Sequence, residues 1–196
     1  MNKALKYRWS AAGLLLLVAV LAVTEVLAGG SSLSLGEMLD SGNAVAHSIL
    51  MKIRLPRLAC AVLAGAGMAL SGAQMQAIFR NPLADPHILG LSSGAALGAA
   101  LAAAGALPAA FSGNLTIAAA AFAGAALAGA GIVAVSARFK GIATLLIFGV
   151  LLGFVCSALT TLCQYFAPEE SLKLYHSWVS GSFASAGWDG IGTVAA

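Results

Sequence analysis

The segment ILGLSSGAALGAALAAAGALPAAFSGNLTIAAAAFAGAALAGAGIVAVSA, residues 88–137, decides the class of fold, because it contains no Asp, Glu, Lys or Arg. A helix that crosses the hydrocarbon core of a bilayer needs about 20 predominantly apolar residues. This segment can therefore hold two membrane spans joined by a turn. A second charge-free segment, residues 141–168, can hold one more.

Composition extends this conclusion to the whole chain of 196 residues, of which 60% are hydrophobic and 9% charged. A soluble domain is about 25% charged, so the composition disfavours a soluble enzyme, a secreted disulfide-rich domain, a disordered tail and a nucleic-acid binder. The net charge of +3 is too small and too scattered to indicate nucleic acid. Cys60, Cys156 and Cys163 lie in apolar stretches without metal-ligand spacing, so we predict no metal and no cofactor.

The charge-free and apolar intervals predict an all-α, polytopic membrane protein with about five spanning helices. We expect these spans at residues 11–29, 58–79, 88–108, 115–137 and 143–166. Residues 171–188 are apolar only in part, and Trp178 and Trp188 are typical of the headgroup region. They predict a short interfacial helix and loop.

Basic residues near the span ends predict the orientation, since they favour the cytoplasmic side. A cytoplasmic N-terminus places six basic residues inside: Lys3, Lys6, Arg8, Arg80, Arg138 and Lys140. The opposite orientation places only four there. The preferred orientation leaves one anomaly, a basic cluster of Lys52, Arg54 and Arg57 on the outer side.

Small residues recur at helical spacing in the predicted spans. Gly90, Gly94 and Gly98 would share one face of the third span, and Gly149 and Gly153 one face of the fifth. Small residues let helix backbones approach closely in a membrane. The pattern indicates tight helix packing, or helices that slide on one another during a transport cycle.

Polar residues interrupt the apolar sequence between the second and third spans. Two prolines, Pro82 and Pro86, follow Asn81 and Asp85, and each proline disfavours a helical predecessor. With Arg80, these residues predict a turn that is either a plain connection or part of a gate or subunit contact. Two further polar residues inside the second span, Gln74 and Gln76, predict interhelical hydrogen bonds or polar groups beside a transport path.

The predicted spans contain no charged residue after Glu25 and no histidine. An intramembrane enzyme would need catalytic groups there, and ion-coupled carriers generally place ionisable groups at mid-membrane. The absence of such groups disfavours both classes. A transporter without ionisable groups in its spans would take its energy from a process outside the membrane-spanning helices, as an ATP-driven permease does.

Several motifs resemble those of one transporter family. They are Arg54-Leu-Pro-Arg57, the Gly- and Ala-rich run 64–72, Arg80-Asn-Pro-Leu-Ala-Asp-Pro86 with Leu89-Gly90, and the later stretches Leu145–Val150 and Trp178–Ser182. Together they resemble the permeases of the FecCD family of bacterial ABC importers, which carry iron-siderophores, haem and cobalamin across the inner membrane. The resemblance covers residues 10–190.

The resemblance implies a permease subunit that is not itself an enzyme and binds no cofactor. It implies a second permease copy, two cytoplasmic ATPase subunits and a periplasmic substrate-binding protein as partners, in the inner membrane. We expect import of an iron chelate, either siderophore or haem, by alternating access. A cobalamin permease and a non-ABC channel or carrier are the alternatives.

Family permeases have about ten spans. We therefore expect residues 1–196 to form one transmembrane domain that is the N-terminal half of a longer protein.

The resemblance also assigns roles to individual residues. Arg54 and Arg57 match the arginines that pair with glutamates of the binding protein, which would explain the outer basic cluster. The loop before the fifth span matches the cytoplasmic gate, and this implies gate residues at Gly141, Ile142, Ala143 and Thr144.

Overall fold

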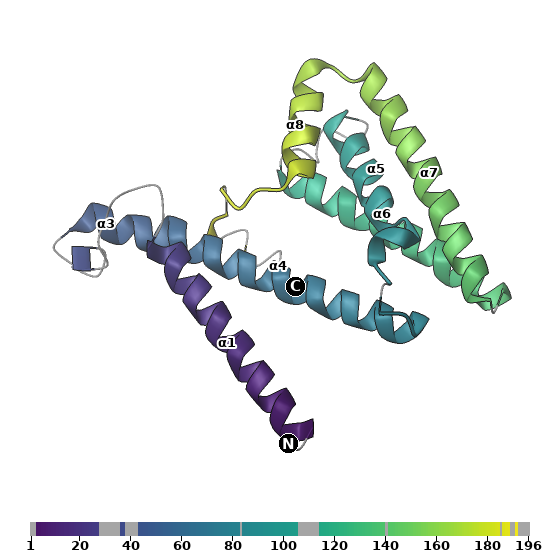
Figure 1. Ribbon diagram of the computed structural model, residues 1–196. Coiled ribbons are helices and arrows are strands. Elements are labelled where there is room, and N and C mark those ends of the chain that lie inside the picture. The colour runs from purple at the N-terminus through teal and green to yellow at the C-terminus, as the bar shows by residue number, and fades with distance from the viewer. Residues whose placement is uncertain are drawn as a thin grey trace. The chain divides into compact units, whose positions relative to one another are not determined.

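The computed structural model describes residues 3–27, 36–37, 43–82, 84–105, 114–139, 141–184, 186–188 and 191. These residues are helical or irregular, and no strand occurs among them (Figure 1), which confirms the all-α prediction. The helices are α1 (Lys3–Leu27), α3 (Ala44–Ile49), the π-helical turn η1 (Leu50–Arg54), α4 (Leu55–Phe79), the 3₁₀ turn η2 (Pro86–Leu89), α5 (Leu91–Ala103), α6 (Asn114–Arg138), α7 (Ile142–Phe166) and α8 (Glu169–Ser180).

The chain divides into two compact units, each described by itself below. Unit 1 comprises residues 1–67 and 183–196, and unit 2 comprises residues 68–182. Helix α4 contributes its first half to unit 1 and its second half to unit 2.

Four described helices are long and apolar enough to cross a membrane: Leu5–Leu27, Ala44–Phe79, Leu115–Arg138 and Ile142–Phe166. The predicted third span, 88–108, is shorter than expected. Its helical part is α5, which has 13 residues and reaches only about 20 Å at 1.5 Å per residue. Residues 88–89 belong to η2 and Gly90 is left-handed, with φ 72°, so a 3₁₀ turn stands where the first turn of a span was expected. The turn predicted between the third and fourth spans begins at Ala104 and Gly105, where Gly105 has φ 73°; residues 106–113 lie outside the described residues.

The predicted second span, 58–79, begins earlier in the structure than expected. One continuous helical stretch of 36 residues runs from Ala44 to Phe79 through the π-helical turn η1. At its start, the Asn43 side chain accepts a hydrogen bond from the Ala46 amide at 3.2 Å and so caps α3.

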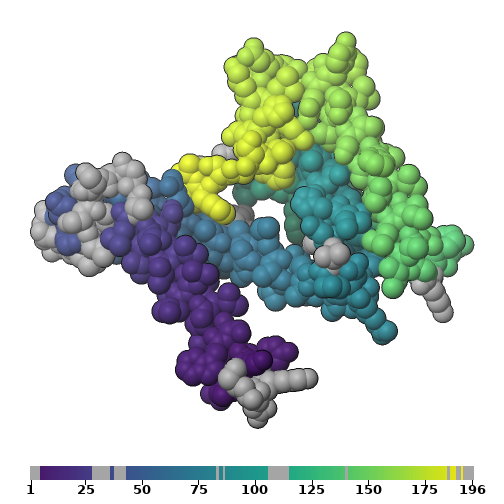
Figure 2. Space-filling view, in the orientation of Figure 1, coloured from purple at the N-terminus to yellow at the C-terminus, as the bar shows by residue number. Residues whose placement is uncertain are grey.

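Unit 1 has a small core where the end of α1 meets the start of this long helix. Ala46 and Leu50 are buried there, and Val26 and Leu55 pack against them. Most of α1 is otherwise exposed, including the apolar run Leu14–Leu17. In the space-filling view its side chains form the visible surface of this part of unit 1 (purple in Figure 2).

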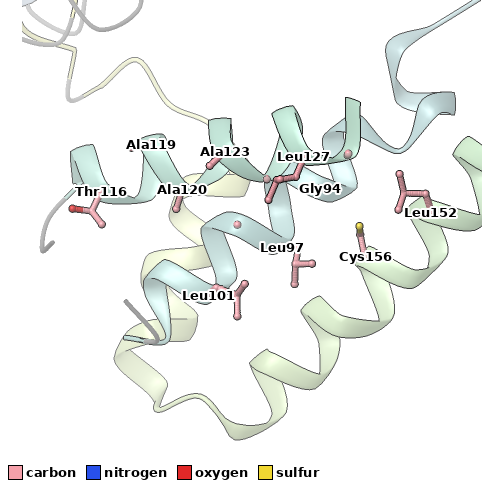
Figure 3. A pocket seen from close by; sticks show the side chains of 13 residues that line it. Gly94, Leu97, Leu101, Thr116, Ala119, Ala120, Ala123, Leu127, Leu152 and Cys156 are labelled. Atoms are coloured by element: carbon pink, nitrogen blue, oxygen red, sulfur yellow. The ribbon is translucent and has the colours of Figure 1, made fainter. Parts of the chain in front are cut away.

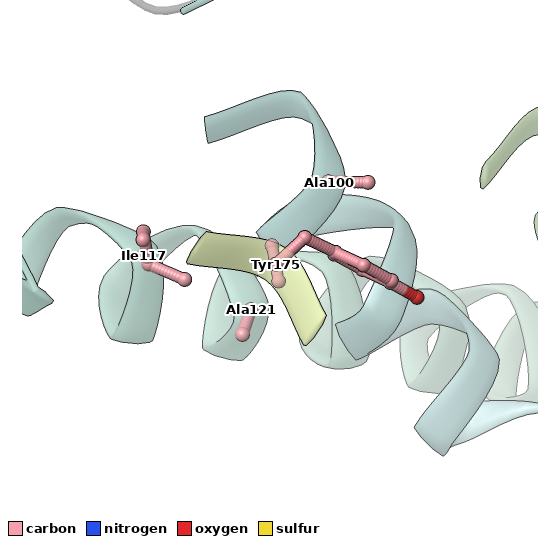
Figure 4. Packing of buried hydrophobic residues seen from close by; sticks show 5 residues of the cluster. Ala100, Ile117, Ala121 and Tyr175 are labelled. Carbon is pink, nitrogen blue, oxygen red and sulfur yellow. The ribbon is translucent and has the colours of Figure 1, made fainter. Parts of the chain in front are cut away.

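Unit 2 has its core where α5, α6 and α8 meet. Ala99 and Ala100 from α5, Ile117 and Ala121 from α6, and Tyr175 from α8 are all buried in one cluster (Figure 4). Alanine dominates because the α5 and α6 backbones lie too close for longer side chains. The aromatic ring of Tyr175 closes the cluster from the side of α8.

Helix α8 is the predicted short element after Pro168. Glu169 and Glu170 lie in its first turn, where carboxylates favour the positive end of the helix dipole. Lys173 forms an exposed ion pair with Glu169 at 2.7 Å. The helix ends before Gly181, which has φ 66°.

Candidate functional site

The two predicted docking arginines have different environments in unit 1. Arg54 is only 6% exposed, and its guanidinium donates to the carbonyl oxygens of Val26 and, at 3.5 Å, Leu27. Arg57 is half-buried, and its Nε donates to the Phe183 carbonyl oxygen at 3.4 Å. The docking role stays a prediction for both residues, but Arg57 is the more accessible one.

Arg57 also lines a pocket of about 590 Å³ in unit 1, between α1 and the first half of α4. Its walls are largely apolar, and Glu25 is the other charged residue that lines it. Glu25 and Arg57 form no ion pair. The pocket therefore places one acidic and one basic side chain against an apolar groove.

The predicted turn between the second and third spans starts with an ordered helix end. The Arg80 amide donates to the Ala77 carbonyl at 3.4 Å and the Asn81 amide to the Gln76 carbonyl at 3.2 Å. This pair of bonds is a Schellman motif, in which glycine usually takes the left-handed position. Here Arg80 takes it, with φ 48°, at a cost of about 1–2 kcal/mol. Pro82 follows and cannot continue the helix.

The second half of this turn is held by Asp85. Its carboxylate accepts a hydrogen bond from the His87 amide at 2.7 Å, and Pro86 starts the 3₁₀ turn η2. The turn ends at Gly90, from which α5 begins. The Asp85 side chain thus acts as a backbone cap, and a contribution of the turn residues to a gate stays a prediction.

Glycines bring α5, α6 and α7 into backbone contact. A Cβ atom added at Gly90 would lie 2.8 Å from the Gly149 carbonyl oxygen and 2.9 Å from the Gly153 amide nitrogen of α7. One added at Gly94 would lie 2.7 Å from the Gly124 carbonyl oxygen of α6. The three glycines of the predicted face therefore serve two different neighbours, with Gly90 against α7 and Gly94 and Gly98 against α6.

The same three helices form an apolar groove of about 620 Å³ (Figure 3). Leu97 and Leu101 of α5, Leu127 of α6, and Leu152 and Cys156 of α7 are among its lining residues. The groove has no charged lining residue, so it suits a hydrocarbon chain or an apolar helix face and not an ion.

A second pocket in unit 2, of about 310 Å³, is lined mainly by hydroxyl and amide groups. They come from the start of α5, one face of α7, and α8: Ser92, Ser93, Ser157, Thr160, Thr161, Gln164 and Tyr175. This hydroxyl pocket was not among the sites predicted from the sequence. Its signal was present, because residues 157, 160, 161 and 164 have the spacing of one helical face.

Tyr175 connects the hydroxyl pocket to the core of unit 2. Burial raises the pKa of its phenol, and a hydrogen bond with the Gln164 side chain partly opposes that shift. The phenol therefore stays neutral and can donate and accept hydrogen bonds in the pocket. Thr160 and Thr161 already donate to the carbonyls of Cys156 and Ser157, at 2.8 and 3.0 Å.

The other predicted path residues are solvent-accessible in the described structure. Gln74 and Gln76 are exposed on the second half of α4. Gly141 caps the N-terminus of α7, and Ile142 to Thr144 form its exposed first turn. Their roles in a path or gate stay predictions. The placement of Arg54 and Arg57 on the side of the membrane opposite Arg138 and Lys140 also stays a prediction. Lys140 lies outside the described residues.

Comparison with known proteins gives consistent matches over nearly the whole chain. The chain is 37% identical over 179 residues to the vitamin B12 import system permease protein BtuC of Klebsiella pneumoniae, covering 90% of this chain and 52% of that protein. It is 37% identical over 185 residues to the protein of the same name from Citrobacter koseri, covering 92% of this chain and 53% of that protein. The chain thus spans about half the length of these relatives.

The fold also matches a solved structure, an inward-facing conformation of an ABC transporter assigned to the metal-chelate type. The TM-score is 0.77 at 34% sequence identity, and the match covers 91% of this chain and 55% of that one. The sequence model of the FecCD transport family matches residues 14–196. The chain belongs to the FecCD transport family.

Proposed function

We propose that this chain forms membrane-spanning helices of an ABC importer permease and that the imported substrate is cobalamin. The observation that carries the proposal is the agreement in sequence over about nine-tenths of the chain with relatives named as vitamin B12 permeases. Transport by alternating access would pass the substrate from the periplasm to the cytoplasm. The N-terminus would be cytoplasmic.

The residues support an externally driven transporter. No charged residue lies in α5, in α6 before Arg138, or in α7. Ion-coupled carriers generally place ionisable groups at this depth. ATP hydrolysis by two cytoplasmic partner subunits would supply the energy, and a second permease copy would complete the path.

The substrate-binding protein would dock on the periplasmic side through Arg57. This guanidinium is half-buried, and among the described residues its hydrogen bond to the Phe183 carbonyl is long, 3.4 Å, so it can turn toward an acidic partner. Charges at the rim of an interface mainly accelerate association and make it depend on salt.

Cobalamin is preferred over an iron chelate on two grounds. The named relatives are vitamin B12 permeases, and the described pockets of unit 2 are uncharged. A neutral corrinoid with many amide groups matches hydroxyl and apolar walls better than an anionic iron-siderophore does. The iron-chelate import expected from the sequence is the second candidate, because the matched structure is of the metal-chelate type.

Uptake assays distinguish the two substrates. The full-length permease that contains this chain would be expressed with its ATPase in cells that lack their own cobalamin permease. We expect uptake of radiolabelled cyanocobalamin to be restored and uptake of an anionic ferric tris-catecholate siderophore to stay at background. Restoration of siderophore uptake alone would replace cobalamin by an iron chelate, and restoration of neither would overturn the importer proposal.

A further inference from the structure

Helix α7 has two faces of opposite character. Four of its polar residues share one face, at the spacing i, i+3, i+4 and i+7, and line the hydroxyl pocket: Ser157, Thr160, Thr161 and Gln164. The opposite face is apolar, and Val155 and Leu162 are exposed there. Polar side chains at membrane depth generally face the protein interior or a water-filled cavity. The apolar face therefore suits lipid, and the hydroxyl pocket suits a polar partner.

The threonine hydroxyls of the pocket offer acceptors to such a partner. Thr160 Oγ1 donates to the Cys156 carbonyl oxygen at 2.8 Å, and Thr161 Oγ1 donates to the Ser157 carbonyl oxygen at 3.0 Å. A hydroxyl has one proton and two lone pairs, so each of these groups has used its proton and keeps lone pairs. This part of the wall favours a ligand that donates hydrogen bonds.

The pocket also contains donors. The buried Tyr175 phenol is neutral and forms a hydrogen bond with the Gln164 side chain. The phenol has one proton and the amide has two, and the bond between them uses one of these. The remaining protons can serve a carbonyl oxygen of the ligand.

A primary carboxamide meets both requirements. Its NH₂ group donates hydrogen bonds and its carbonyl oxygen accepts them. A carboxylate cannot donate, and none of the described residues that line the pocket carries a charge that would compensate for its burial. The pocket should therefore select a neutral amide over the acid of the same size.

The size of the pocket limits how much of a ligand can enter. Its volume of about 310 Å³ lies at the lower end of the range of about 300–1,000 Å³ that is typical of sites for whole small molecules. A corrinoid ring with its substituents is too large for it, whereas one of the carboxamide side chains fits. Ser157 and Thr161 are exposed, so a side chain can enter past them toward the buried Thr160 and Tyr175.

We propose that the hydroxyl pocket of α5, α7 and α8 binds one carboxamide side chain of the corrinoid during import. Thr160 and Thr161 accept hydrogen bonds from its NH₂ group, and Tyr175 and Gln164 donate to its carbonyl oxygen. The proposal deepens the proposed function and rests on it. An Asn or Gln side chain of a neighbouring helix has the same chemistry, so the test compares two substrates that differ only in this group.

The two substrates are cyanocobalamin and a cyanocobalamin monocarboxylic acid, in which one side-chain carboxamide is hydrolysed to a carboxylate. Each acid of this series is tested in cells that contain the full-length permease with its ATPase and binding protein. Selectivity is the initial uptake rate of cyanocobalamin divided by that of the acid. The preference of the binding protein is common to all permease variants, so it cancels when their selectivities are compared.

The double variant Thr160→Val with Thr161→Val keeps the shapes of the side chains and removes both acceptors. Uptake of cyanocobalamin should fall about tenfold, because two hydrogen bonds are lost. Uptake of the acid whose altered side chain would enter the pocket should stay unchanged, because a carboxylate does not use these acceptors. Selectivity against this acid should therefore fall about tenfold.

Ser136→Ala is the matched control. The Ser136 hydroxyl also donates within its own helix, to the Val133 carbonyl oxygen at 2.7 Å, but Ser136 does not line the hydroxyl pocket. This variant should leave the selectivity unchanged.

A gain of uptake protects the test against misfolding. Thr161→Lys places an ammonium group at the exposed side of the pocket, where it can form a charge-assisted hydrogen bond with a carboxylate. Uptake of the same acid should rise above its rate in the unaltered permease, a result that a damaged protein cannot give.

The opposite results are equally specific. Equal loss of uptake of cyanocobalamin and of every acid in both threonine variants would assign the hydroxyls to a contact with a neighbouring helix and overturn the binding site. Unchanged uptake of cyanocobalamin in the double variant would overturn it as well. Failure of the proposed function is a different result, since the unaltered permease would then import no cyanocobalamin.

Discussion

Replacement of Gly98 by alanine should loosen the contact between α5 and α6. A methyl group at Gly98 would overlap the Ala120 carbonyl oxygen and lie 2.8 Å from the carbonyl carbon and 3.2 Å from the Ala121 Cα. These are backbone atoms of α6, so no side chain can rotate away. Overpacking costs about 1–3 kcal/mol, and the upper value applies where only backbone can move.

The net effect is smaller because alanine favours a helix over glycine by about 1 kcal/mol. We therefore expect Gly98→Ala to destabilise the packing of α5 by about 2 kcal/mol, which increases the open population about 25-fold. The buried thiol of Cys156, which is 7% exposed, reports this opening. Its alkylation rate in detergent micelles is measured with Cys60 and Cys163 replaced by alanine.

Gly67→Ala is the matched control. It is also a helical glycine, in α4, but no atom beyond its own turn of helix lies within 4 Å of an added Cβ. This variant should gain helix stability and leave the alkylation rate of Cys156 unchanged. Equal alkylation rates of Cys156 in Gly98→Ala and Gly67→Ala would show that the close contact between the α5 and α6 backbones does not limit the opening of α5.

Three further predictions concern other parts of the chain. Burial raises the pKa of Tyr175 in the folded state, so its contribution to the free energy of unfolding should be complete below about pH 10 and should decline at higher pH. Tyr175→Phe should remove this decline, which is measured as the change of the thermal unfolding temperature with pH. Gly149→Ala would place a Cβ 2.8 Å from the Leu89 Cα, so it should destabilise by about 1–3 kcal/mol and accelerate the same thiol alkylation. The Trp188 indole Nε1 donates to the Met51 carbonyl oxygen at 2.6 Å, five residues before Pro56, which has no N–H. Pro56→Ala adds an amide donor that competes for this carbonyl, so acrylamide quenching of Trp188 should increase when the other two tryptophans are replaced by phenylalanine.

The long helices of unit 2 were predictable nearly to the residue. The expected spans 115–137 and 143–166 compare with α6, Asn114–Arg138, and α7, Ile142–Phe166. Neither contains a charged residue before Arg138, and both end at residues that a membrane helix tolerates poorly: Arg138, and Pro168 shortly after α7. Composition alone determines such helices, because each satisfies its own backbone hydrogen bonds.

The third span was predicted wrongly because apolar composition does not distinguish a long helix from a turn followed by a short one. Asp85 and Gly90 decide this difference, through a side-chain cap and a left-handed backbone. The second span began too late in the prediction because Arg54 and Arg57 were expected at a membrane surface. Arg54 is buried against carbonyls about 28 residues earlier, a long-range contact that no periodicity reveals and that extends the helix beyond the predicted start.

The π turn also determines how α4 tolerates changes in length. Each residue rotates an α-helix by about 100°, so a deletion elsewhere in the 36-residue stretch from Ala44 to Phe79 would turn all later side chains toward new neighbours. The wide turn Leu50–Arg54 holds one surplus residue. Deletion there can restore the ordinary helical register with both flanking faces in phase, so sequence alignments of related chains should place single-residue gaps at this turn.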